Sequence, residues 1–167
     1  IDLLKDNGIK EVLLLTGYLH EQIEQYFGDG EKFGLSISYS HSSVSDDTGT
    51  RIRKAKDLIQ KEFLLLYADN YWPLQLNQLY SFYKKKNIDG LVTVYANKDG
   101  YTKNNVYVTQ EGLVSSYDKG KKEKKLNGVD IGFFILKKSI IDLLPEKNCS
   151  FEKIVLPILI KKKQLAG

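Results

Sequence analysis

The chain has 167 residues, of which 42% are hydrophobic and 28% are charged, a composition typical of an ordinary globular domain. Its 25 basic and 21 acidic residues give a mixed-sign surface with a net charge of +4, so nucleic acid is not expected as a partner. A single cysteine excludes an internal disulfide, and no group of Cys and His has metal-ligand spacing, which disfavours zinc and indicates a reducing, cytoplasmic location. No apolar run reaches the roughly 18 residues that spanning a bilayer requires, so no membrane span is expected.

The first part of the chain alternates helical and strand patterns. After the end of a helix that stops at Gly8, strands are predicted at 9–16, 35–39, 63–67 and 91–96, and helices at 21–27, 51–61 and 76–83. Continuous apolar runs such as Val12-Leu13-Leu14-Leu15 suit strands that are covered on both faces. This alternation predicts βαβ units and a parallel sheet with right-handed crossovers.

The second part of the chain has a different pattern. Short apolar runs at 105–109 and 113–117 flank Gln110-Glu111-Gly112, which predicts an antiparallel hairpin. A further strand is predicted at 129–136, and helices at 139–144 and 151–163, the latter capped by Ser150. The predicted fold class is α/β: a Rossmann-like, mainly parallel, twisted sheet with flanking helices and a small antiparallel extension. We expect one domain over 1–167, truncated at both ends because Ile1 stands inside a helical pattern.

An acidic residue, Asp69, follows the apolar strand at 63–67. In a parallel sheet the ligand crevice lies beyond the carboxyl ends of the strands, so a carboxylate here points to where phosphates bind. Mg²⁺ takes oxygen ligands, usually one or two carboxylates together with substrate phosphates, so Asp69 is an adequate anchor for it. The alternative is an ordinary turn, because Asp-Asn after a strand is common turn chemistry.

Other polar residues are candidates for ligand binding. Thr48-Gly49-Thr50 precedes a predicted helix, where free N–H groups favour an anion, although as a lone motif it is better explained by an N-cap with a flexible lead-in. Lys119 could offer an ammonium group to a phosphate, and Glu152 could accept sugar hydroxyls or simply complement a helix dipole. Lys119 also begins a run typical of solvated loops, with Lys121, Lys122, Lys124 and Lys125. His20 and His41 have no sequence partner that suggests a triad or a metal site, and are interpreted as surface or loop residues.

In their order along the chain, these pieces resemble the sugar nucleotidyltransferase family. Five segments carry the resemblance to the family motifs L-G-T, x-G-D, F-x-E-K, V-N-x-G-I-Y and s-x-E, in that order: Thr48-Gly49-Thr50, Tyr67-Ala68-Asp69, Tyr117-Asp118-Lys119, Val129-Asp130-Ile131-Gly132-Phe133 and Ser150-Phe151-Glu152. The family's N-terminal G-G-x-G-T-R…P-K loop and its closing D-I-G-T element are absent between Ile1 and Gly167. We therefore expect this fragment alone not to catalyse.

The resemblance implies a function and a set of site residues. The activity is transfer of a nucleotidyl group from a nucleoside triphosphate to a sugar 1-phosphate, releasing pyrophosphate, in nucleotide-sugar and polysaccharide biosynthesis. The best guess is guanylyl transfer to mannose or heptose 1-phosphate, and a homo-oligomer is compatible with it. The implied roles are Mg²⁺ binding for Asp69, phosphate contact for Lys119, nucleotide contact for Thr48, Gly49 and Thr50, and sugar contact for Asp130, Gly132 and Glu152.

Two alternatives remain open. A metal-dependent glycosyltransferase of the related nucleotide-sugar fold would also place an acidic residue at a strand end, but such sites usually show Asp-x-Asp, and Asp69-Asn70-Tyr71 lacks the second Asp. The other is a non-catalytic domain that binds nucleotide sugars or regulates another protein while keeping the fold.

Overall fold

The structure is a computed structural model that describes residues 1–120 and 125–167, so Lys121, Lys122 and Lys124 of the lysine run lie outside the described residues. The helices are α1 (Asp2–Asp6), α2 (His20–Phe27), α3 (Thr48–Lys54), α4 (Leu76–Lys86) and α5 (Phe151–Lys161). The strands are β1 (Glu11–Thr16), β2 (Ser36–His41), β3 (Glu62–Leu66), β4 (Gly90–Tyr95), β5 (Val106–Val108), β6 (Val114–Tyr117), β7 (Val129–Lys137) and β8 (Leu165–Ala166). Within this described part, no helix is both long enough and apolar enough to cross a bilayer.

The strands form three sheets that contain both parallel and antiparallel pairs. β1 and β2 form a parallel pair, and β3, β7, β4 and β8 form a four-stranded sheet in that order. β3 and β4 both run antiparallel to β7, and β8 runs parallel to β4, so three of these four strands point the same way. β5 and β6 form the predicted antiparallel hairpin. The alternation of strand and helix patterns along the sequence did not predict that β7 lies between β3 and β4 and runs antiparallel to both.

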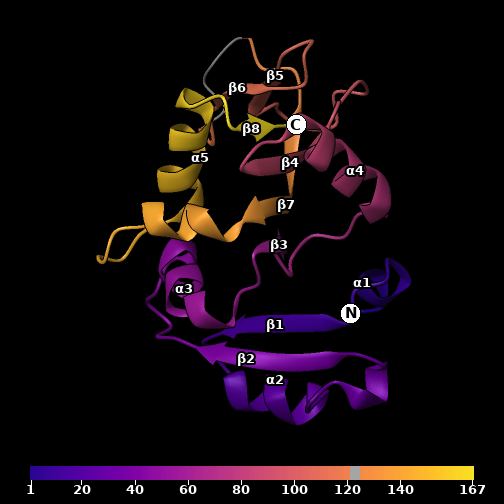
Figure 1. The fold of residues 1–167 in the computed structure, drawn as a ribbon, viewed down its shortest axis with the longest axis vertical. Coiled ribbons are helices and arrows are strands. Elements are labelled where there is room, and N and C mark those ends of the chain that lie inside the picture. The colour runs from indigo at the N-terminus through magenta and orange to yellow at the C-terminus, as the bar shows by residue number, and fades with distance from the viewer. Residues whose placement is uncertain (121–124) are drawn as a thin grey trace.

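The four-stranded sheet is covered on both faces, as its continuous apolar runs predicted. Successive residues of a strand point to opposite faces. On β7, Phe134 and Leu136 pack into the cluster that contains residues of α3 and α5, whereas Ile135 packs into the cluster that contains Tyr83 of α4. Figure 1 shows α5 and α4 on opposite sides of β4 and β7. The sheet is therefore the middle layer of an α/β arrangement.

Several predicted elements differ from the observed ones. The helix predicted at 51–61 begins earlier, at Thr48, and ends at Lys54, after which a short 3-10 turn (Lys56–Leu58) leads into β3. The chain must leave the helical path to enter β3, and this turns the side chain of Leu58 outward to 54% exposure. The segment predicted as a helix at 139–144 is a 3-10 helix (Lys138–Leu143), and β8 was not predicted at all.

Arg51 ties the end of β1 to the loop before α3. Its guanidinium group donates hydrogen bonds to the Thr16 carbonyl and to the Ser42 hydroxyl, both at 2.9 Å. It also donates to main-chain carbonyls of the same loop, including that of Ser43 at 3.0 Å. A Cβ atom at Gly17 would lie 2.6 Å from the Arg51 guanidinium, so a larger residue here would displace this arginine from its hydrogen bonds. Arg51 therefore has a structural role: it holds the loop before α3 against the end of β1.

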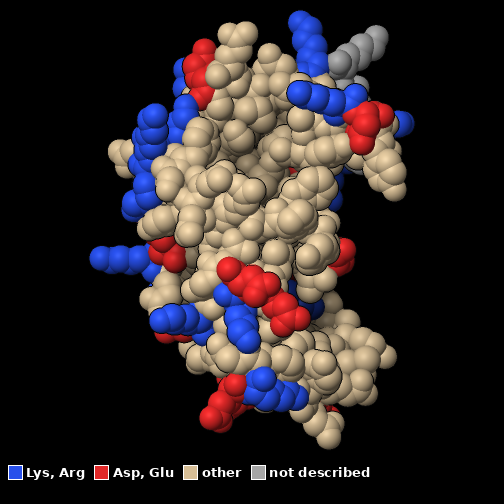
Figure 2. Space-filling model, turned by 90° about the vertical axis from the view of Figure 1, so that its right-hand side faces the viewer, with Lys and Arg blue, Asp and Glu red and all other residues tan. Residues whose placement is uncertain are grey.

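Charges of both signs are interspersed on the surface. On the face seen in Figure 2, lysine and arginine side chains lie beside aspartate and glutamate side chains. Ion pairs account for part of this mixture, such as Lys54 with Asp46 at 2.6 Å and Lys84 with Glu62 at 2.9 Å. These pairs involve partly exposed side chains and contribute little to stability.

Candidate active site

Glu152 is the centre of a polar cluster that joins three elements. It lies in the first turn of α5 and is only 6% exposed. One carboxylate oxygen accepts hydrogen bonds from the Ser150 hydroxyl at 2.8 Å and from the Thr48 hydroxyl at 3.3 Å. The other oxygen lies 3.1 Å from the ammonium group of Lys119, which follows β6. The cluster therefore brings together residues predicted for nucleotide, phosphate and sugar.

The local structure of α5 explains how Glu152 is held. Ser150 caps the helix, as predicted, by accepting a hydrogen bond from the backbone N–H of Lys153. Burial raises the pKa of Glu152, but its own backbone N–H, the Ser150 hydroxyl and the Lys119 ammonium outweigh burial and lower the pKa below its usual value. Glu152 is therefore a carboxylate with a fixed orientation.

Asp130 forms a second acidic centre, at the start of β7. Its carboxylate accepts hydrogen bonds from the backbone N–H of Gly132 at 2.7 Å and from the Tyr117 hydroxyl at 3.0 Å. Its own N–H donates to the side-chain oxygen of the buried Asn105 at 2.8 Å. Burial raises the pKa of Asp130, and the nearby charge of Glu152 raises it further. The environment therefore raises the pKa of Asp130 and lowers that of Glu152.

Two tyrosines border these acidic groups and were not assigned roles from the sequence. Burial raises the pKa of Tyr117 and, next, the charge of Asp130 does so. The Tyr67 hydroxyl is buried close to Glu152 and Thr48, and burial followed by the charge of Glu152 raises its pKa. Each tyrosine is the first residue of a motif segment, which is the signal that could have identified it.

Asp69 lies in the turn that follows β3, next to the Asp130 segment. A Cβ atom at Gly132 would lie 3.4 Å from the Tyr67 ring, and the Asn70 amide donates a hydrogen bond to the Ile131 carbonyl. Asp69 itself is exposed, and within 1–120 and 125–167 its carboxylate makes no hydrogen bond or ion pair. The structure places Asp69 beyond the carboxyl end of β3, as predicted, but every residue of that strand is only partly buried, whereas a buried strand was expected.

The donors around Asp69 suit one mode of Mg²⁺ binding. Both oxygens of the neighbouring Asp130 carboxylate are already hydrogen-bonded. No group of three His, Cys, Asp or Glu side chains in the described residues gathers around Asp69. Mg²⁺ commonly uses one or two carboxylates and completes its shell with phosphates and water. Asp69 fits the ion in that mode only, and its metal role stays a prediction.

The segment Thr48-Gly49-Thr50 uses its backbone in a way the sequence did not reveal. The N–H groups of Gly49 and Thr50 both donate to the Cys149 carbonyl, at 2.9 and 3.2 Å. A Cβ atom at Gly49 would lie 2.8 Å from that carbonyl oxygen, so glycine allows α3 to pack against the start of α5. These two N–H groups are thus occupied within the protein, and the side chain of Thr48 is the part that faces Glu152. Nucleotide contact by this segment stays a prediction.

The interpretation of His20 and His41 as isolated residues is wrong. His20 begins α2 and His41 ends β2, and one ring nitrogen of each histidine lies close to the same carboxylate oxygen of Glu24. The sequence signal that could have found them is their position after two parallel strands, because parallel strands end at the same edge of a sheet. They lie apart from the Glu152 cluster and are considered below.

Comparison with known proteins identifies the family. The family model described as nucleotidyl transferase matches residues 1–166, and the chain belongs to this family. It is 28% identical to mannose-1-phosphate guanyltransferase of Saccharomyces cerevisiae, an alignment that covers 99% of this chain and 47% of the relative. It is 30% identical to D-glycero-alpha-D-manno-heptose 1-phosphate guanylyltransferase of Campylobacter jejuni, covering 91% of this chain and 66% of the relative. The chain spans about half the length of several curated relatives. It covers 47% of the yeast protein and 46% of mannose-1-phosphate guanylyltransferase catalytic subunit beta of Drosophila pseudoobscura pseudoobscura.

Solved structures confirm the α/β fold. The chain is similar to a putative glucose-1-phosphate thymidylyltransferase from Bacillus anthracis, with a TM-score of 0.82 and 16% identity over 98% of this chain and 69% of that chain. It is also similar to HddC from Yersinia pseudotuberculosis, with a TM-score of 0.75 and 20% identity over 93% of this chain and 68% of that chain.

The raised pKa of Asp130 predicts how pH affects stability. Because its native pKa lies above its unfolded value, this group contributes most to the free energy of unfolding at low pH. That contribution is lost as pH rises through the native pKa. Asparagine has the same shape and does not titrate. We expect the free energy of unfolding of Asp130→Asn, relative to the unchanged protein, to become more favourable from about pH 4 to about pH 7.

Urea denaturation of both proteins at a series of pH values measures this difference. Asp57→Asn, at an exposed residue between α3 and β3, is the matched control for the substitution itself. A difference for Asp130→Asn that is flat, or that falls with pH, contradicts the prediction.

Proposed function

We propose that the protein containing this chain transfers a nucleotidyl group from a nucleoside triphosphate to a sugar 1-phosphate, releasing pyrophosphate and a nucleotide sugar. One observation carries the proposal: the Glu152 carboxylate links Lys119 and Thr48, residues from the hairpin end and from the first turn of α3. Membership of the nucleotidyl transferase family supports it.

The reaction is a phosphoryl transfer in which positioning and charge supply the rate. An oxygen of the sugar phosphate attacks the α-phosphorus of the nucleotide in line, and the bond from that phosphorus to the pyrophosphate oxygen breaks. Lys119, with a side chain that is 64% exposed, can reach a phosphate while Glu152 holds its position. No side chain of this segment needs to form a covalent bond.

The sugar is held by the fixed acceptors of the cluster. Glu152 and Asp130 each have carboxylate oxygens oriented by neighbouring donors, so they can accept hydrogen bonds from sugar hydroxyls without reorganising. Gly132 orients Asp130, because its backbone N–H donates a hydrogen bond to the Asp130 carboxylate. Thr48 of α3 donates a hydrogen bond to Glu152 and would contact the nucleotide.

Asp69 would hold Mg²⁺ beside the reacting phosphates. When bound, this ion supplies positive charge that offsets the negative charge developing on the phosphate oxygens. Asp69 suits this role because its carboxylate is exposed and is not engaged by other described residues.

We further propose guanylyl transfer to a mannose or heptose 1-phosphate, in the cytoplasm, as a step that supplies polysaccharide biosynthesis. The relatives named as mannose-1-phosphate and heptose-1-phosphate guanylyltransferases support this choice of base and sugar. A relative from Bacillus subtilis, named as a probable glucose-1-phosphate cytidylyltransferase, is 29% identical and marks cytidine as the competing base.

Pyrophosphate exchange in the full-length protein tests the function. Radiolabelled pyrophosphate, Mg²⁺ and one nucleotide sugar are incubated with the enzyme, and label is measured in the nucleoside triphosphate. We expect exchange with GDP-mannose or a GDP-heptose, and at least tenfold less with CDP-glucose, UDP-glucose or dTDP-glucose, because a base pocket that pairs with polar groups rejects other bases.

The outcomes separate the alternatives. No exchange with any of these nucleotide sugars contradicts the enzymatic proposal and favours a domain that only binds them. Hydrolysis or transfer of the sugar, with release of a nucleoside diphosphate and no exchange, favours a glycosyltransferase. Exchange with CDP-glucose alone retains the reaction class and overturns the choice of base.

A further inference from the structure

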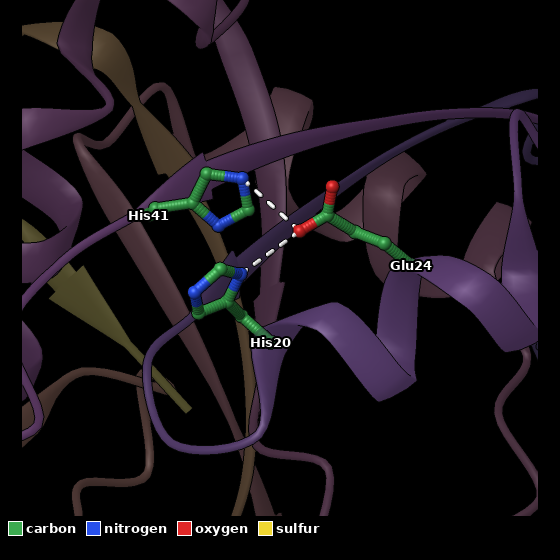
Figure 3. Close-up of side chains that lie close together, drawn as sticks. All are labelled: His20, Glu24 and His41. Atoms are coloured by element: carbon green, nitrogen blue, oxygen red, sulfur yellow. Dashed lines mark hydrogen bonds and ion pairs between the residues drawn. The ribbon is translucent and has the colours of Figure 1, made fainter.

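A compact group of metal-ligating side chains lies outside the proposed active site. It consists of His20, Glu24 and His41, which point toward one another from the first two turns of α2 and the end of β2 (Figure 3). The Nδ1 atom of His20 lies 3.1 Å from the Oε1 atom of Glu24, and the Nε2 atom of His41 lies 3.2 Å from the same oxygen. The three ligand atoms all lie within 4.8 Å of one another.

We propose that His20, Glu24 and His41 bind a Zn²⁺ ion. Two imidazoles and one carboxylate form a ligand set that Zn²⁺ accepts, with bonds of about 2.0 to 2.2 Å. In a tetrahedral site with such bonds, neighbouring ligand atoms lie about 3.4 Å apart. The two distances to Glu24 are already within a few tenths of an ångström of that value. Only the two histidine rings need to approach each other.

The backbone brings these ligands together. His20 and Glu24 are four residues apart on α2, and side chains at this spacing share a face of a helix. His41 arrives from β2, which pairs in parallel with β1, and Thr16 at the end of β1 lies directly opposite His41. The site therefore rests on a helix and on a paired strand, which hold ligands more accurately than loops do.

A second layer of contacts orients one ligand. The Nδ1 atom of His41 lies 2.7 Å from the hydroxyl of Thr16, which is only 5% exposed. The hydroxyl can accept a hydrogen bond from the Nδ1–H group of His41. The lone pair of Nε2 then points at the cluster, which is the arrangement typical of metal-bound histidines. The Thr16 carbonyl is in turn held by Arg51 at 2.9 Å.

The chemistry of the ligands selects the ion. Imidazole nitrogen suits Zn²⁺ and neighbouring transition metals, whereas Mg²⁺ prefers oxygen ligands and keeps several waters. The side chains of the three residues are between 36% and 46% exposed, so a fourth position can be filled by water. The site would join the start of α2 to the end of β2, just before the loop that Arg51 binds. This inference does not depend on the proposed function.

Titration of the metal-free, full-length protein with ZnCl₂ by isothermal titration calorimetry tests the site. We expect one Zn²⁺ per chain with a micromolar or tighter Kd, unaffected by millimolar Mg²⁺. The variants His20→Ala, His41→Ala and Glu24→Gln should each weaken binding by about tenfold or more. Thr16→Val, which keeps the carbonyl that Arg51 binds, should weaken it by about tenfold. Glu21→Gln, an exposed residue of the same helix, should bind as the unchanged protein does.

Spectroscopy gives a second readout. Co²⁺ in place of Zn²⁺ should produce the visible absorption bands of a tetrahedral site, and these should disappear in His41→Ala, while circular dichroism shows that the variant stays folded. Two results would overturn the proposal: no saturable Zn²⁺ binding to the folded protein, or binding that the three ligand variants leave unchanged.

Discussion

Replacing Asp69 by asparagine in the full-length protein is expected to lower the turnover number by about 100-fold or more while leaving the fold intact. The expectation rests on the proposed reaction, in which charge on the phosphates must be offset, and removing one such interaction typically costs about 100-fold to 1000-fold. The fold should survive because Asp69 is exposed and makes no hydrogen bond in the described part of the chain.

Steady-state rates at increasing Mg²⁺ concentration measure this effect. If Asp69 holds the ion, the variant should also need more Mg²⁺ for its half-maximal rate, since asparagine offers a neutral oxygen in place of a carboxylate. Asp57→Asn is the matched control, because Asp57 is an exposed acid that precedes β3 whereas Asp69 follows it. A turnover number near that of the unchanged protein would contradict the assigned role.

The burial of the central strands could be predicted from the sequence. β4 and β7 are continuous apolar runs with little polar alternation, and such runs suit strands covered on both faces. In the structure, neighbouring residues such as Leu91 and Val92 pack into different clusters on the two faces. The reason is local: where both faces of a strand are buried, as from Phe133 to Leu136, successive positions must be apolar, and this requirement is visible in the sequence.

The direction of β7 could not be predicted in the same way. An apolar run has the same pattern whether the strand is parallel or antiparallel to its neighbours, so the run at 129–136 fixed its burial and left its pairing open. The insertion of β7 between β3 and β4 depends on contacts between residues about 70 positions apart, such as Leu66 with Phe133. Neither local propensity nor turn chemistry carries that information.

The sequence predicted which residues form the candidate site, but not how those residues contact one another. Asp130, Glu152 and Lys119 were identified through motifs, and the structure adds that Lys119 pairs with Glu152 and that Asp130 is held by Gly132. The N–H groups of Gly49 and Thr50 were expected to be free, and they bind the Cys149 carbonyl because α3 packs directly against α5. Hydrogen bonds between residues 100 positions apart depend on how the helices pack, which the sequence pattern does not specify.

The two histidines show the same limit. The spacing of His20 and Glu24 on a helix is visible in the sequence, but their third partner, His41, lies at the end of another strand. Predicting β2 to stop at residue 39 placed His41 in a loop, whereas the strand continues to His41 and aligns it with Thr16. Because the predicted strand ended two residues too early, His41 was not recognised as a possible ligand.

Replacing Glu152 by glutamine is expected to raise the KM for the sugar 1-phosphate by about tenfold to 100-fold, with a smaller change in the turnover number. A hydrogen bond that involves a charged group contributes about 1.5 to 3 kcal/mol, and its loss in both ground and transition states raises KM. The variant keeps the shape of the side chain but loses the charge that holds Lys119 at 3.1 Å. Initial rates at varied sugar phosphate concentration measure KM. Glu146→Gln, on the exposed loop before α5, is the control.

The same variant should change the response of the fold to acid. The native pKa of Glu152 lies below its unfolded value, so its carboxylate stabilises the fold above the unfolded pKa, and that stabilisation is lost as pH falls through the native pKa. Glutamine has no such dependence. The free energy of unfolding of the variant, relative to the unchanged protein, should therefore become less favourable as pH rises, opposite in sign to Asp130→Asn. An unchanged KM together with a flat pH response would contradict the role assigned to Glu152.

A double-mutant cycle with Lys119→Met separates two ways in which Glu152 could act. If Glu152 works only by positioning Lys119, the two substitutions remove one and the same interaction, and the effect of the double variant on KM should equal that of either single variant. If Glu152 itself accepts hydrogen bonds from the sugar, its loss should add a further increase in KM to that of Lys119→Met. We expect the second result, because only one carboxylate oxygen faces Lys119, while the other is oriented by the hydroxyls of Ser150 and Thr48.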